Sequence, residues 1–100
     1  MSKVYISNAP NGFDFTNAQR FGELVPLISG SVNIFRPDTL GEELARKLQQ
    51  FEADDYLLLA GGVLPAFWVG QFIPEHLERI KLLLFDMKTK EYFVRTIQLG

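Results

Sequence analysis

The sequence predicts a small α/β domain with a Rossmann-like layered fold: a mostly parallel central sheet, helices packed on it, and an antiparallel C-terminal hairpin. Residues 56–60 and, apart from Lys81, residues 80–85 are apolar without alternation, which is typical of interior parallel strands covered on both faces. A helical segment lies between them, and such a strand–helix–strand unit forms parallel neighbours through a right-handed crossover. We expect one domain over residues 1–100, with residues 4–6 as a further parallel strand beside this unit.

The first part of the chain predicts a strand, a helical turn and an edge strand. Residues 4–6 are a short β-rich apolar run, and a dense cluster of turn formers follows at 7–12. A single helical turn then ends at Gly22, because glycine readily adopts the conformations that terminate helices. Residues 24–28 predict a strand, and Pro26, which has no N–H for a ladder, favours an edge position.

An amphipathic helix over residues 39–51 is the clearest local element. Thr39 and Glu42 have the spacing of a capping box at its start. Glu43 and Lys47 are an i,i+4 ion pair in the favoured orientation on the polar face. The apolar side chains recur at helical spacing and form one stripe, made of Leu40, Leu44, Leu48 and Phe51.

The last part of the chain predicts a second helix, a buried strand and a hairpin. The helix begins near Pro65, a residue that suits the first helical position. It ends near Ile73 or bends at Pro74, because proline cannot continue a straight helix. Polar residues 87–90 predict a hairpin loop, after which residues 91–99 return as an antiparallel strand.

Composition excludes several classes of protein. The chain is 47% hydrophobic and 22% charged, which is typical of an ordered globular domain. Its formal net charge of −2 provides no basic surplus for nucleic acid or anionic lipid. The absence of cysteine excludes disulfides, thiolate catalysis, zinc fingers and iron–sulfur clusters. No apolar run is long enough for a membrane span, so we expect a cytoplasmic protein without a nucleic-acid or membrane partner.

Catalytic groups are scarce, and we expect no catalytic residue, no metal ligand and no cofactor. His76, the single histidine, is either a general base or a solvated residue on the outer face of a helical turn. Asp54 and Asp55 form either a hard-ion site or the polar loop end before a buried strand. A small metal-assisted hydrolase remains an alternative function, which turnover of a candidate ligand, lost on chelation, would support.

The candidate ligand site lies at the carboxyl ends of the predicted parallel strands. Gly61 and Gly62 follow a buried strand and open a helix, so bare N–H groups and the positive end of a helix dipole meet there. Asn8 and Asn11 follow the first strand and offer amide groups to a base or a sugar. If the two strands are parallel neighbours, both loops border the crevice where ligands of open α/β sheets bind.

Each of these residue types also has a purely structural explanation. The glycine pair matches neither specific phosphate-binding fingerprint, and a tight turn with positive φ is its alternative role. Asx-turn bonds are the alternative for the two asparagines. Stacking on a ligand is open to Phe13 or Phe15, and contact with a phosphate to Arg20, Arg36 or Arg95, which are otherwise surface cations.

The second predicted helix is apolar around its whole circumference. Packing on the sheet covers one face, and a helix of this kind needs cover on the other face as well. The large side chains Phe67, Trp68 and Phe72 are suited to anchor a contact with a partner subunit. We therefore predict a homodimer or a higher oligomer, with the alternative that residues 13–35 fold back over the helix.

Four stretches of the sequence resemble small α/β proteins encoded in bacteriophage genomes, a group with no established catalytic motif. They are Phe21-Gly22-Glu23-Leu24-Val25-Pro26-Leu27 followed by Gly30-x-Val32-Asn33, then Asp55-Tyr56-Leu57-Leu58-Leu59-Ala60-Gly61, Leu82-Leu83-Leu84-Phe85-Asp86 and Tyr92-Phe93-Val94-Arg95. The resemblance implies a viral accessory protein in the host cytoplasm. Phage proteins of this kind include sponges that sequester nucleotide immune signals and others that bind and block host proteins.

The sequence and the resemblance together lead to one preferred function and one alternative of another class. The preferred function is a non-catalytic, dimeric module that binds a nucleotide-type ligand, such as a host immune signal. The alternative is a viral protein–protein interaction or inhibitor module without a small-molecule ligand, motivated by the same surplus of apolar surface.

Overall fold

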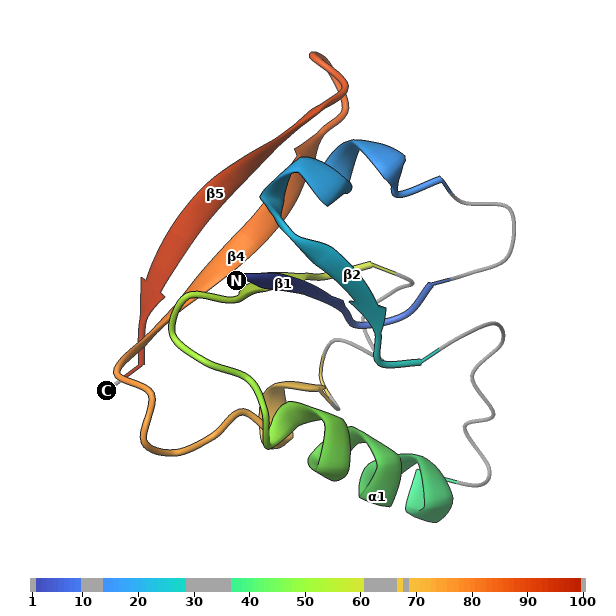
Figure 1. The fold of residues 1–100 in the computed structure, drawn as a ribbon, viewed down its shortest axis with the longest axis vertical. Coiled ribbons are helices and arrows are strands. Elements are labelled where there is room, and N and C mark those ends of the chain that lie inside the picture. The colour runs from blue at the N-terminus through green and yellow to red at the C-terminus, as the bar shows by residue number, and fades with distance from the viewer. Residues whose placement is uncertain (1, 10–13, 29–36, 61–66, 68, 100) are drawn as a thin grey trace.

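The centre of the molecule is a five-stranded mixed sheet with the order β2-β1-β3-β4-β5 (Figure 1). The computed structural model describes residues 2–9, 14–28, 37–60, 67 and 69–99. The first four strands in this order are parallel, and β5 pairs antiparallel with β4. The strands are β1 (Lys3–Ile6), β2 (Glu23–Pro26), β3 (Tyr56–Leu58), β4 (Arg79–Asp86) and β5 (Glu91–Gln98).

The parallel pairing of β1 with β3 confirms the prediction on which the candidate ligand site depends. Ile6 of β1 lies opposite Leu58 of β3, and Leu58 in turn lies opposite Leu83 of β4. The predicted edge position of the strand that contains Pro26 is also confirmed, because β2 pairs with β1 alone. β3 ends at Leu58, two residues earlier than its apolar run predicts.

One face of the sheet packs against α1 (Pro37–Leu48), which lies below the strands in Figure 1. Tyr5 points to this face from the centre of the sheet and packs with Leu44, Leu48 and Leu57 in one buried cluster. The ring of Tyr5 also meets the buried ring of Phe51, with 5.0 Å between the centroids. Leu44, Leu48 and Phe51 of the predicted apolar stripe therefore pack against the sheet, as their helical spacing indicates.

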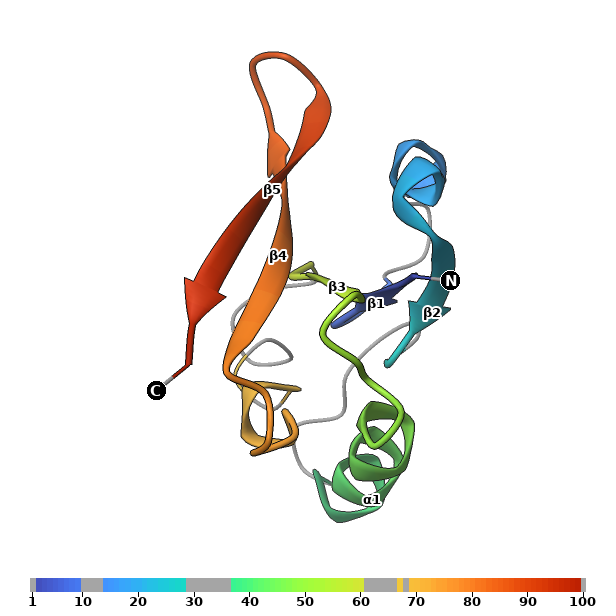
Figure 2. The same cartoon turned by 60° about the vertical axis from the view of Figure 1, so that its left-hand side comes forward.

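The opposite face is covered in part by η1 (Thr16–Phe21), a 3₁₀-helix (Figure 2). Val4 and Ile6 alternate with Tyr5 along β1 and point to this side, where they pack with the fully buried Ala18. The predicted helical turn ends as expected at Gly22, whose N–H donates to the carbonyl of Gln19 at 3.1 Å. Gly22 has φ = 155°, a backbone conformation that is strained for residues with a side chain.

The start of α1 differs from the prediction. The helix begins at Pro37 and ends at Leu48, so Thr39 lies inside its first turn and the predicted capping box is wrong. Proline is favourable at the first helical position because its missing N–H would have no partner there. After Leu48 the chain continues as a turn, with the N–H of Phe51 donating to the carbonyl of Leu48 at 3.0 Å.

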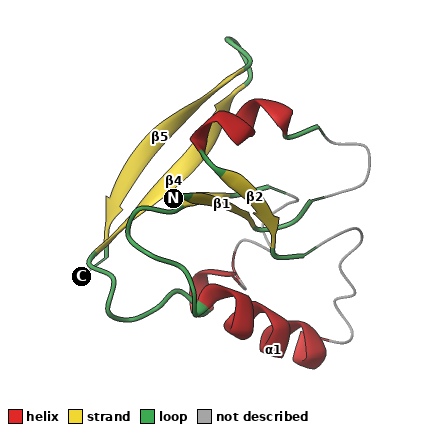
Figure 3. Ribbon diagram, in the orientation of Figure 1, coloured by secondary structure: helices red, strands yellow, loops and turns green. Residues whose placement is uncertain are grey.

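The connection from β3 to β4 is helical at residues 67 and 69–71 (Figure 3). Val69 is fully buried in the cluster on the α1 side, so this helix packs on the same face as α1. Its predicted start near Pro65 lies outside the described residues. A small α/β fold is therefore established, and the Rossmann-like layering of helices over the whole sheet stays a prediction.

Candidate functional site

The strand order reverses between β1 and β3, so connections leave these two neighbouring strands toward opposite edges of the sheet. In open α/β sheets this switch point, at the carboxyl ends of the strands, is where ligands bind. Ile6 and Leu58 are the last paired residues here, so the chain segments that follow them lie next to each other. The structure thus brings the residues around Asn8 beside those around Ala60, as the sequence predicts.

Ser7 fills the position directly beyond the last paired residues. Its N–H donates to the carbonyl of Leu58 at 3.0 Å. Its hydroxyl donates to the carbonyl of Ala60 at 2.7 Å and accepts from the N–H of Ala60 at 2.8 Å. Sequence reasoning treats Ser7 only as a turn former and misses this bridge, because the partner is 53 residues away. A ligand at this edge must therefore lie beyond the Ser7–Ala60 bridge.

Asn8, the next residue, has a buried polar atom without a partner. Its side chain is 5% exposed, and within the described part of the chain its Oδ1 accepts no hydrogen bond. The backbone around it is held in place, since the N–H of Ala9 donates to the carbonyl of Ile28 at 2.8 Å. A buried acceptor left unpaired costs about 1–3 kcal/mol, so this atom is a candidate contact for a ligand that donates a hydrogen bond.

The other predicted ligand residues lie outside the described residues: Asn11, Gly61 and Gly62. Of the two phenylalanines predicted as stacking candidates, Phe13 lies outside as well, and Phe15 is buried in the core cluster beneath η1. Asn8 is therefore the predicted ligand residue that the structure places at the switch point.

Among the described residues, Lys47 of α1 brings a cation to the carboxyl end of β2. Its ammonium group donates to the carbonyls of Pro26 and Leu27 at 3.2 and 3.3 Å, at the carboxyl end of β2. It also forms the predicted i,i+4 pair with Glu43, at 3.1 Å. Lys47 thereby links α1 to the end of β2. Its ammonium group already contacts two carbonyl oxygens and one carboxylate oxygen, so it is poorly suited to bind a phosphate.

The amino ends of the strands carry structural contacts. Asp55 is buried, and its two carboxylate oxygens accept from the N–H groups of Lys3 and Glu52, each at 2.8 Å. This geometry supports the loop-end role of the aspartate pair over a hard-ion site. His76 is exposed and lines a cavity of about 340 Å³ together with Glu52, Leu77 and other residues of the β3 and β4 starts.

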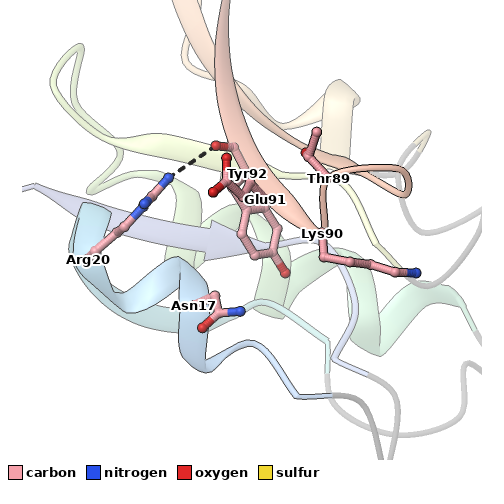
Figure 4. A pocket seen from close by; sticks show the side chains of 6 residues that line it. All are labelled: Asn17, Arg20, Thr89, Lys90, Glu91 and Tyr92. Atoms are coloured by element: carbon pink, nitrogen blue, oxygen red, sulfur yellow. Dashed lines mark hydrogen bonds between the residues drawn. The ribbon is translucent and has the colours of Figure 1, made fainter.

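A second cavity, of about 330 Å³, lies between η1 and the hairpin of β4 and β5 (Figure 4). The Arg20 guanidinium donates to the backbone carbonyl of Tyr92 at 3.3 Å and lies 4.8 Å above the ring of Phe21. In Figure 4 the Lys90 side chain points away from Arg20, so the two cations do not converge on one anion. The cavity is lined by Asn17, Arg20, Thr89, Lys90, Glu91 and Tyr92.

Two ionisable groups near this cavity have shifted pKa values. Burial raises the pKa of the Tyr92 phenol, and the charge of Asp14 raises it further. The pKa of Asp14 is lowered because its carboxylate accepts hydrogen bonds from the hydroxyl and the N–H of Thr16. Both shifts move the pKa further from neutrality, so neither Tyr92 nor Asp14 changes its protonation state near neutral pH.

The predicted interface residues occupy different environments. Phe67 is 64% exposed, whereas Phe72 is half-buried and packs against the core cluster on the α1 side. Trp68 lies outside the described residues. An interface through this helix stays a prediction, with Phe67 as its one exposed anchor in the described part of the chain.

The described residues contain neither a cluster suited to a metal ion nor a membrane-spanning helix. Among them, no three side chains of histidine, aspartate or glutamate are grouped in a way that suits a metal ion. None of their helices has the length and apolar character that a membrane crossing requires.

The chain matches a known protein family over nearly its whole length. No curated protein and no solved structure matches the chain. The model of a protein family described as Phage Pam3 gp32-like protein matches residues 2–99, which is nearly the whole chain. The bacteriophage resemblance expected from the sequence is therefore confirmed, and the chain belongs to the Phage Pam3 gp32-like protein family.

Proposed function

We propose that this phage protein is a non-catalytic module that binds a small nucleotide-type ligand at the carboxyl ends of β1 and β3. The observation that carries the proposal is the unpaired Oδ1 of Asn8, which is buried at the point where the strand order reverses. A buried acceptor without a partner lowers the stability of the folded protein. A ligand that donates a hydrogen bond to Asn8 Oδ1 would offset this cost on binding.

The chemistry of the site narrows the ligand. A neutral amide oxygen accepts hydrogen bonds, so it selects an exocyclic amino group or ring N–H of a base, or a sugar hydroxyl. Lys47, the cation that the structure places at this edge, is already shared among three oxygen atoms. Recognition in the described part of the site is therefore directed at the base or the sugar of a nucleotide. Sequestration of a host nucleotide signal in the host cytoplasm is the role that fits a phage protein of this kind.

Thermal-shift and calorimetric measurements test the proposal directly. Wild-type protein is mixed with cyclic AMP, cyclic di-GMP, ADP-ribose and cyclic ADP-ribose, with inorganic phosphate as the control for the anion alone. We expect at least one of these nucleotides to raise the melting temperature, since ligands that bind only the folded state stabilise it. A panel without any shift overturns the proposal.

Asn8→Leu is the decisive variant, because leucine has a similar volume and no acceptor. We expect it to lose the nucleotide-induced shift while unfolding at the same or a higher denaturant concentration than wild type. Asn17→Leu is the matched control: this exposed asparagine lines the cavity beside η1 and is not at the switch point. Binding that survives in Asn8→Leu and disappears in Asn17→Leu assigns the ligand to that cavity and contradicts the proposal.

A further inference from the structure

β5 is an edge strand with an open hydrogen-bonding side. Among the described residues it is the last strand in the sheet and pairs with β4 alone, and it is eight residues long. The N–H of Leu99 donates to the carbonyl of Glu78 at 2.8 Å, in register with the β4–β5 ladder. Hydrogen bonding alternates along an antiparallel strand. The backbone N–H and C=O groups of the odd-numbered residues of β5 therefore point toward β4, and those of the even-numbered residues point outward.

Only the C-terminal half of this edge is open in the described structure. Near the hairpin loop, the outward carbonyl of Tyr92 accepts from Arg20 of η1, and the cavity beside η1 lies against it. In Figures 1 and 2 the C-terminal half of β5 forms the outer border of the molecule. Apolar side chains are exposed along this half, with Val94, Ile97 and Leu99 each about two-fifths exposed.

We propose that two copies of this chain pair antiparallel through the open half of β5, with Ile97 opposite Ile97 of the second copy on the two-fold axis. A two-fold axis perpendicular to the sheet places one residue opposite its own copy and keeps each face continuous. In this register Thr96 lies opposite Gln98 of the second copy, and both residues have outward backbone groups that form ladder bonds. The two sheets become one, which removes both exposed edges.

Charge disfavours the registers whose axis lies at Arg95 or Thr96. An axis at Arg95 places two like charges directly opposite, and an axis at Thr96 places them diagonally, both of which are unfavourable. An axis nearer the hairpin loop would need the outward backbone carbonyl of Tyr92 for a ladder bond, and this carbonyl already accepts a hydrogen bond from Arg20. The axis at Ile97 separates the two arginines and sets each Arg95 opposite Leu99 of the other copy, whose ladder neighbour is Glu78.

Glu78 and Arg95 of the second copy complete the complementarity. They lie two strand spacings apart, about 10 Å between backbones, and their long side chains meet over Leu99. Glu78 is exposed, and in the described part of the chain it has no ion-pair partner of its own. The contact occurs twice in the pair by symmetry, and it flanks the apolar contact between the two Ile97 side chains.

Charge exchange and mass measurement test this interface. Wild-type protein is expected to be dimeric by light scattering at about 100 µM, a concentration that reveals even weak pairing. Arg95→Glu and Glu78→Arg each bring like charges together and should weaken the dimer about tenfold or more, and the double variant should restore it. A strictly monomeric wild type overturns the proposal, and so does a dimer that neither single exchange affects.

Cysteine substitution tests the register, since the chain contains no cysteine of its own. Under mild oxidation Ile97→Cys should form a disulfide-linked dimer, because the Cα atoms of a non-hydrogen-bonded antiparallel pair lie about 4.5 Å apart, within the range of disulfides. Phe93→Cys is the matched control, with a similar exposure on the same strand face and no copy of itself opposite. Cross-linking at position 93 but not at 97 contradicts the register.

Phe67→Glu separates this interface from the one predicted on the β3–β4 helix. Phe67 is well exposed and lies outside the β5 edge, so its substitution should leave the dimer mass unchanged if β5 forms the interface. A dimer that Phe67→Glu dissociates and Arg95→Glu leaves intact contradicts the β5 proposal and supports the helix instead.

Discussion

The two edges of the sheet are built in opposite ways. β2 has four residues and includes Pro26, whereas β5 has eight residues and no proline. The N–H of Leu27 donates to the carbonyl of Ile6, so Pro26 lies at the alternate position, where its missing N–H would face outward. Lys47 further occupies the carbonyls of Pro26 and Leu27. The β2 edge thus offers few groups to another strand, and β5 offers several.

The difference shows how a small protein directs its association. Natural sheets protect edges with short strands and proline among other features, and a long edge strand without proline is more open to pairing. In Figures 1 and 2 α1 lies below and η1 above the β2 side of the sheet, while the C-terminal half of β5 forms the outer border of the molecule. Pairing through β5 alone yields a closed pair of molecules, whereas two open edges would allow a chain of them.

The largest expected effect is a difference in unfolding free energy between substitutions at the two edges of the sheet. Leu27 is fully buried beneath α1 and follows β2, while Ile97 on β5 is 39% exposed. Leu27→Ala should reduce the free energy of unfolding by about 2–5 kcal/mol, because it leaves a cavity in a packed core. Ile97→Ala should cost about 1 kcal/mol or less in dilute solution. Urea denaturation of both variants measures the difference, and equal losses would contradict it.

Gly22 tests how β2 is joined to η1. Its φ of 155° is strained for other residues, and a Cβ atom there would lie 2.8 Å from the carbonyl carbon of Ser2. Gly22→Ala should therefore lower stability by about 2 kcal/mol or more. Gly70→Ala is the matched control, because nothing lies within 4 Å of its added Cβ, and it should be neutral or stabilising by up to about 1 kcal/mol. Thermal unfolding compares the two, and an unaffected Gly22→Ala would refute the argument.

Lys47 tests whether its carbonyl contacts or its ion pair secures the β2 edge. Lys47→Met keeps the aliphatic stem and removes the donors to Pro26 and Leu27, and it should cost about 1 kcal/mol. Glu43→Gln removes only the exposed side of the ion pair, and its expected cost is about 0.3–0.5 kcal/mol. Chemical denaturation resolves these values, and a larger loss for Glu43→Gln would assign the stabilisation to the ion pair.

Stability at alkaline pH depends on two tyrosines, Tyr5 on the α1 face of the sheet and Tyr92 on the η1 face. Burial raises the pKa of Tyr5, which lies beneath α1, and burial with Asp14 raises the pKa of Tyr92 on β5. The unfolded chain loses these protons first, so stability is complete below the unfolded pKa of about 10 and falls as pH rises through the folded values. Urea midpoints between about pH 9 and pH 11 should decline in wild type and less steeply in Tyr92→Phe. Parallel curves would contradict this linkage.

The local elements of the fold follow from sequence patterns that act over short distances. The apolar run at 56–60, and the run at 80–85 that only Lys81 interrupts, predict interior strands because both faces of such strands need cover, and both strands are found. Pro26 predicts an edge because it has no N–H, and the strand is at an edge. The boundaries of α1 are less well predicted, since a proline and a capping threonine two residues apart are both acceptable starts.

Only part of the candidate site can be predicted from the sequence. Asn8 follows a predicted strand, and the parallel pairing of that strand with β3 places it at the switch point as expected. The sequence does not reveal that Asn8 keeps an unpaired Oδ1 while its neighbour Ser7 is fully bonded to Ala60. Both residues are ordinary turn formers, and which one finds a partner depends on a segment more than fifty residues away.

The amino-acid sequence by itself therefore determined the strands, the amphipathic helix, the edge position of β2 and the membership in a phage protein family. Hydrophobic periodicity and the backbone restrictions of proline and glycine act on neighbouring residues, so they can be read directly from the chain. The tertiary structure alone decided which polar atoms remain unpaired and which backbone groups of β5 face outward. Those outcomes depend on contacts between distant segments, whose register no local pattern specifies.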